Sequence, residues 1–150
     1  EATEALLNSP GDLALDSSGN LLIADRGNRR VRRITPAGVI STVAGSSRGF
    51  PYADPSGDRA TEVGLGRVEG MAVDAAGRIY IAESSRISVV GTDGRLRVLT
   101  GFIGQDDDGR KLYLDEARNG CDGLAVDAQG RLYFSLRQEG RVMLAEPVNP

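Results

Sequence analysis

Apolar residues are concentrated in short segments that recur at long intervals along the chain. Three of these segments, at residues 21–24, 79–82 and 132–134, are apolar at successive positions instead of at every second one. Such strands are typical of a sheet whose two faces are both covered. Each segment follows an Asp-x-x-Gly sequence, in which the carboxylate is expected to accept backbone N–H bonds and the glycine to take a positive φ. The pattern therefore predicts tight hairpins with a buried second strand.

This hairpin pattern occurs three times. The turn aspartates of the three copies, Asp16, Asp74 and Asp127, are 58 and then 53 residues apart. A third strand is expected after each hairpin and a fourth after the next turn: the third strands at 30–34, 86–90 and 141–145, the fourth at 39–43 and 96–99. Four meandering strands at such a long period form one blade of a β-propeller, and radial stacking of blades covers both faces of each sheet.

The predicted fold class is therefore all-β, with propeller blades of four antiparallel strands. Three blades are placed at about 10–45, 68–101 and 121–147, and the outer strand of the third is missing within the chain. Blades at the two ends of such an array leave unpaired backbone and an apolar face uncovered. We therefore expect a second chain, or the remainder of a longer parent protein, to close the ring.

Composition and charge exclude several classes of function. The net charge of −3 offers no general attraction to nucleic acid, and few aromatic residues are present to stack on bases. The chain has no His, so it contains no Ser-His-Asp or Cys-His pair and no His-ligated zinc site. Its single cysteine, Cys121, is interpreted as a small buried hydrophobe. No apolar stretch is long enough to span a membrane.

Four consecutive segments of the first copy together resemble one complete NHL repeat: residues 10–16, 19–25, 28–34 and 38–45. Residues 2–10 and 59–65 resemble the interblade segment of the long bacterial form of this repeat. The resemblance implies a propeller that closes with six blades, of which this chain would supply half. It also implies a non-catalytic scaffold that binds a protein, glycan or peptide partner, and it favours an extracellular or periplasmic location.

The candidate binding residues follow the second strand of the first two copies. They are Arg26, Asn28 and Arg29 in the first copy, and Glu83 in the second, where the first copy has Asp25. Loops at one end of a propeller are exposed and are held by a rigid scaffold, so they are suited to partner contact. The third copy departs from this pattern, because Leu136 stands at the place of the acid.

Two acidic residues form a candidate metal site. Glu69 and Asp122 each stand two residues before the start of an innermost strand, at Met71 and Leu124, which places both at one mouth of the channel. Two carboxylates brought together repel, and a hard cation such as Ca²⁺ would relieve the repulsion.

The sequences around these two acids resemble the metal-site segments of gluconolactonase-type propellers. This resemblance implies an alternative function, a metal-dependent hydrolase or lyase. The structural alternative is that Glu69 and Asp122 cap the entry of their strands and face water.

Overall fold

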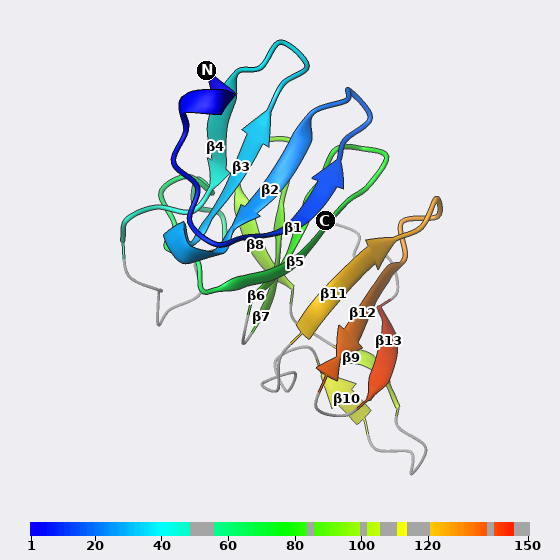
Figure 1. The fold of residues 1–150 in the computed structure, drawn as a ribbon. Coiled ribbons are helices and arrows are strands. Elements are labelled where there is room, and N and C mark those ends of the chain that lie inside the picture. Colours follow the sequence, from blue (N-terminus) through cyan, green and yellow to red (C-terminus); the bar gives the residue numbers. More distant parts are fainter. Residues whose placement is uncertain are drawn as a thin grey trace.

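The computed structural model describes residues 1–48, 56–83, 86–99, 102–105, 111–113, 121–137 and 140–145. Within these ranges the chain is almost entirely β-structure, in three antiparallel sheets of four, four and three strands and one short hairpin. This confirms the predicted fold class of propeller blades (Figure 1). No helix of the described residues has the length and the apolar character needed to cross a bilayer.

The strands of each sheet follow one another in sequence order. The first blade contains β1 (Pro10–Leu15), β2 (Leu21–Asp25), β3 (Arg30–Ile34) and β4 (Ile40–Ala44), with the short 3-10 helices η1 (Ala2–Glu4) before β1 and η2 (Arg26–Asn28) after β2. The second blade contains β5 (Val68–Val73), β6 (Ile79–Glu83), β7 (Arg86–Val90) and β8 (Leu96–Leu99). The third contains β11 (Cys121–Val126), β12 (Leu132–Leu136) and β13 (Arg141–Ala145).

The hairpin of β9 (Phe102–Gln105) and β10 (Lys111–Tyr113) lies between the second and third blades in sequence, and the sequence pattern did not predict it. The outer ends of the predicted second and third blades, at residues 100–101 and 146–147, lie outside the described residues.

The Asp-x-x-Gly turns have the predicted geometry. In the second blade the Asp74 carboxylate accepts hydrogen bonds from the backbone N–H groups of Ala76 and Arg78, at 3.0 and 2.8 Å. Gly77 has a φ of 85°, a value that an L-residue seldom adopts. Asp16 and Asp127 accept equivalent bonds in the other two blades. The repeated aspartates therefore hold the hairpins.

The second blade is covered on both faces, and this explains its continuous apolar strands. Along β6, Ile79 and Ile81 belong to the core shared with the first blade, whereas Tyr80 and Ala82 belong to the core shared with the third. All five residues of β6 are buried. The outward faces of the first and third blades are not covered in this way, since Leu15 of β1 is 68% exposed and Val142 of β13 is 73% exposed.

The innermost strands of the three blades lie side by side, because β5 packs against both β1 and β11 (Figure 1). Each of these strands has an irregular register near its start, between Pro10 and Leu13, between Val68 and Gly70, and between Cys121 and Leu124. The residues at these irregular positions include Glu69 and Asp122. The fold therefore gathers the starts of the three strands at one end of the blades.

Candidate binding site between the first two blades

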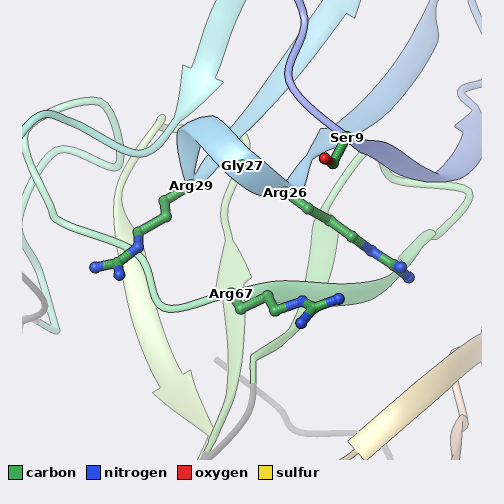
Figure 2. Close-up of a pocket in the computed structure, with 5 residues that line it drawn as sticks. All are labelled: Ser9, Arg26, Gly27, Arg29 and Arg67. Carbon is green, nitrogen blue, oxygen red and sulfur yellow. The ribbon is translucent and has the colours of Figure 1, made fainter.

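A pocket of about 370 Å³ opens at this end of the blades, between η2 of the first blade and the segment that enters β5 of the second. Its lining residues are Ser9, Arg26, Gly27, Arg29 and Arg67. Three of these five residues carry a guanidinium group, so the lining is strongly basic. In Figure 2 the Arg26 and Arg67 side chains end on one side of the pocket and Arg29 extends on the other.

Arg26 joins the first blade to the second. Its Nε donates to the carbonyl oxygen of Val68 at 3.1 Å, and its Nη2 donates to the carbonyl oxygen of Glu69 at 2.8 Å. The side chain passes so close to Gly11 that a Cβ atom at residue 11 would collide with the Arg26 guanidinium. Gly11 occupies the position of Glu69 and Asp122 in the other blades, so the missing acid of the first blade leaves room for Arg26.

Glu69 lies between two of the arginines. Its carboxylate is 3.2 Å from Nε of Arg67 and 3.9 Å from Nη2 of Arg26, and its side chain is mostly buried. Arg67 is exposed to solvent and Arg26 is partly covered. The pocket and its rim therefore combine three positive charges with one negative charge.

Two pocket residues have an unusual backbone conformation. Ser9 has a φ of 47° and Arg29 a φ of 52°, and no other non-glycine residue of the described ranges has a positive φ. The left-handed conformation costs an L-residue about 1–2 kcal/mol, because its Cβ approaches the following carbonyl oxygen. Both strained residues of the described chain thus lie at one pocket.

Asn28 supports the pocket from within the blade. Its Nδ2 donates to Oδ2 of Asp25 at 2.8 Å, and Oδ1 of Asp25 accepts the backbone N–H of Asn8 at 2.8 Å. Asp25 is completely buried. These bonds tie the incoming segment at Asn8 to the end of β2, next to the pocket residue Ser9.

Glu83 makes the equivalent connection in the second blade. It is completely buried, and its carboxylate accepts bonds from the backbone N–H of Gly66 at 2.6 Å, from Nε of Arg86 at 2.8 Å and from the Ser88 hydroxyl at 2.8 Å. Glu83 thus holds the segment that carries Arg67, and its contacts are internal to the fold.

Asp122 stands at the position of Glu69 in the third blade. Both acids lie within β11 and β5, at the second residue of each strand, and not before the strands as predicted. Its carboxylate pairs with Nε of Arg137 at 2.7 Å, and its carbonyl oxygen lies against Gly70 of β5. Glu69 and Asp122 therefore belong to strands that pack together, but each has an arginine as its counter-ion.

The described residues do not form a complete set of metal ligands at these two acids. Among the residues that the structure describes, no group of three or more acidic, His or Cys side chains is placed to hold a metal ion. A cation at Glu69 or Asp122 would compete with the guanidinium that already pairs with the carboxylate. The structure thus brings these two acids to one end of the blades, and within the described ranges each has an arginine as its neighbour.

Sequence reasoning missed Ser9 and Arg67, which belong to the segments entering β1 and β5. Neither residue is part of the aligned hairpin pattern, and their proximity depends on how two blades stack. A single exposed arginine before a strand is a common feature, so no signal in the sequence pointed to Arg67.

The comparison with family models identifies the repeat. Residues 7–34 match the model of the NHL repeat. The chain contains an NHL repeat. The matched range covers β1, β2 and β3 and contains four of the five pocket residues, all but Arg67. This confirms the resemblance found in the first copy of the pattern.

Solved structures share the propeller fold at low identity. A Bacteroides thetaiotaomicron protein of unknown function is 14% identical, with a TM-score of 0.65 over 91% of this chain and 47% of that one. A gluconolactonase from Xanthomonas campestris is 20% identical, with a TM-score of 0.57 over 96% of this chain and 40% of the enzyme. A chain of a nidogen/laminin complex is 20% identical, with a TM-score of 0.55 over 95% of this chain and 49% of that one.

The chain thus spans about half the length of the solved structures that it matches. No curated protein matches it.

Proposed function

We propose that this NHL-repeat chain is a binding scaffold for a protein, glycan or peptide partner, with no chemistry of its own. The observation that carries the proposal is the basic pocket between the first two blades. Arg26 is held in place by two backbone carbonyls of the neighbouring blade, and the pocket segments are anchored by the buried acids Asp25 and Glu83. A site built on a rigid framework in this way is pre-organised for binding.

The candidate residues then have two kinds of role. Arg26 and Arg29 line the pocket and contact the partner. Asn28 and Glu83 position the segments on either side of it, through the bonds of Asn28 to Asp25 and of Glu83 to Gly66. Substitution of Arg29 is expected to weaken binding without unfolding. Substitution of Arg26, which also joins the two blades, or of a positioning residue is expected to lower stability as well.

The outward faces of the end blades support the proposal that further blades complete the ring. The face of β1 that bears Leu13 and Leu15 corresponds to the face of β5 that bears Met71 and Val73, and Met71 is buried against the first blade. The second blade shows how such a face is covered by a neighbour. We propose that a second copy of the chain, or the remainder of its parent, supplies that neighbour.

The catalytic alternative rests on the fold that the chain shares with a gluconolactonase. Calcium at Glu69 and Asp122 would be its signature. The arginine counter-ions of both acids favour the scaffold instead, because a guanidinium already neutralises each carboxylate.

One experiment separates the two functions. The chain is screened against peptide and glycan arrays, and it is titrated with calcium in parallel with an Asp122→Ala variant. The scaffold predicts a bound peptide or glycan whose affinity falls in Arg29→Gln, and no saturable calcium binding. Saturable calcium binding that Asp122→Ala abolishes, together with empty arrays, would replace the scaffold by the metal-dependent enzyme.

A further inference from the structure

We propose that the pocket formed by Ser9, Arg26, Gly27, Arg29 and Arg67 recognises an acidic peptide segment through its side-chain carboxylates. The inference rests on the proposed binding function and specifies the chemistry of the partner.

The charges of the pocket are separated into two groups. On one side, Arg26 and Arg67 share the single carboxylate of Glu69, so one positive charge is left in excess. On the other side, Arg29 forms no ion pair with any residue that the structure describes. Figure 2 shows the Arg29 guanidinium directed away from the other two.

This separation favours a ligand with more than one negative group. A guanidinium binds a carboxylate through two parallel N–H bonds, which is the geometry that arginine provides best. A compact ion would reach one of the two groups of charge, whereas neighbouring acidic residues of a peptide carry carboxylates that are several ångströms apart. An acidic segment can therefore engage Arg29 and the Arg26–Arg67 pair together.

The backbone strain points to the same site. Ser9 and Arg29, the two non-glycine residues with a positive φ in the described ranges, both line the pocket. Strain of this kind persists where surrounding contacts hold it in place, and it occurs preferentially at ligand-binding sites. At residue 29 a glycine or asparagine would adopt the left-handed conformation at a lower cost than the arginine does.

The lining argues for a peptide over a sugar. Its side chains are three arginines and one serine, with no aromatic ring on which a sugar could stack. The volume of about 370 Å³ is at the small end of the range for ligand pockets. Two carboxylate-bearing side chains suit such a site better than a large hydrophobic group.

The test measures binding of a fluorescent oligoglutamate peptide to the complete chain by anisotropy. Two comparison ligands are used. Oligoglutamine is a peptide without charge, and oligogalacturonate carries its carboxylates on a sugar chain. The peptide is expected to bind saturably and to weaken as salt is added, because the contacts are ionic. Arg29→Gln is expected to reduce its affinity about tenfold, the size of one lost charge-assisted contact.

The matched control is Arg33→Gln, which removes the same charge from an exposed position of β3 that does not line the pocket. Arg29→Asn is a second variant that keeps the left-handed backbone accessible, and it is expected to melt no lower than the wild type while binding about tenfold more weakly. Equal losses in Arg29→Gln and Arg33→Gln would show attraction to the surface as a whole and would overturn the proposal.

The outcomes also distinguish this inference from the proposed function. If oligogalacturonate or oligoglutamine binds at the pocket and oligoglutamate does not, the scaffold function stands and the acidic-peptide inference is wrong. If no ligand binds at the pocket in these assays or in the arrays, both fail.

Discussion

The buried acid Glu83 is expected to be essential for the stability of the second blade. Its carboxylate is completely buried and accepts bonds from Gly66, Arg86 and Ser88. Glu83→Ala removes the acceptor of all three donors at once, and the Arg86 side chain is itself only 11% exposed. Removing one partner of a buried ion pair costs about 3–5 kcal/mol, because the remaining charge stays in a site with little water.

The loss is measured as the free energy of unfolding in denaturant and as the melting temperature followed by circular dichroism. For a chain of 150 residues the predicted loss corresponds to a fall of roughly 6–20 °C. Glu83→Gln retains one carbonyl acceptor but no charge, so it is expected to lose an intermediate amount, about 1–3 kcal/mol. Glu62→Ala, an exposed acid on the segment before β5, is the control and is expected to change stability by less than about 0.5 kcal/mol.

The third blade provides a natural comparison. There Leu136 stands at the position of Glu83 and is 4% exposed, and Met143 stands at the position of Ser88. The double variant Glu83→Leu, Ser88→Met copies this apolar solution and is expected to lose less stability than Glu83→Ala. If Glu83→Ala were no less stable than Glu62→Ala, the proposed role of Glu83 in holding the incoming segment would be wrong. Should Glu83→Ala fail to fold, Glu83→Gln decides the question.

Three further predictions concern packing, pH and thiol reactivity. Gly70→Ala places a Cβ atom against the carbonyl oxygen of Asp122 and should destabilise the chain by about 1–3 kcal/mol in denaturant unfolding. The control Gly123→Ala should cost less, because the nearest neighbour of its Cβ atom would be the Ser135 hydroxyl at 3.1 Å. Equal effects of the two substitutions would contradict the close contact between β5 and β11. Burial alone would raise the pKa of Asp127, but bonds from the backbone and side chain of Arg131 and from the backbone of Gln129 outweigh it and hold that pKa below its usual value. A carboxyl whose pKa is lowered by folding stabilises the fold at pH values above its unfolded-state pKa, and this contribution is lost as the pH falls through its folded-state pKa. The free energy of unfolding should therefore decrease below about pH 4, and it should decrease less steeply in Asp127→Asn. Between about pH 5 and 8 stability should be nearly constant, because the chain has no His; a steep change there in unfolding curves would refute this. Burial, followed by the charge of Asp122, raises the pKa of Cys121 to about 12, so iodoacetamide should label this thiol only after unfolding, and rapid labelling of the folded chain would show that β11 opens.

The secondary structure of the blades could be predicted from the amino-acid pattern because its causes are local. The Asp74 carboxylate and the positive φ of Gly77 belong to one four-residue turn, so the hairpin is encoded within a few positions. The continuous apolar run at 79–82 likewise required cover on both faces, and the two neighbouring blades supply it. The exposed faces of the end blades follow from the same reasoning, as Leu15 and Val142 show.

The candidate site could be predicted only in part, because it depends on contacts between residues distant in sequence. Arg26 and Arg29 were singled out from the loop after β2, but Arg67 joins them only when the second blade stacks on the first, 38 residues farther along the chain than Arg29. The equivalence of Glu69 and Asp122 could be seen in the repeat, whereas their pairing with Arg67 and Arg137 could not. A repeat defines which positions correspond, but a charge-neutralising partner depends on where long, flexible arginine side chains reach in three dimensions. For the same reason, the sequence indicated Glu83 as a loop residue suited to partner contact, and only the path of the segment at Gly66 shows that it is a buried hydrogen-bond acceptor.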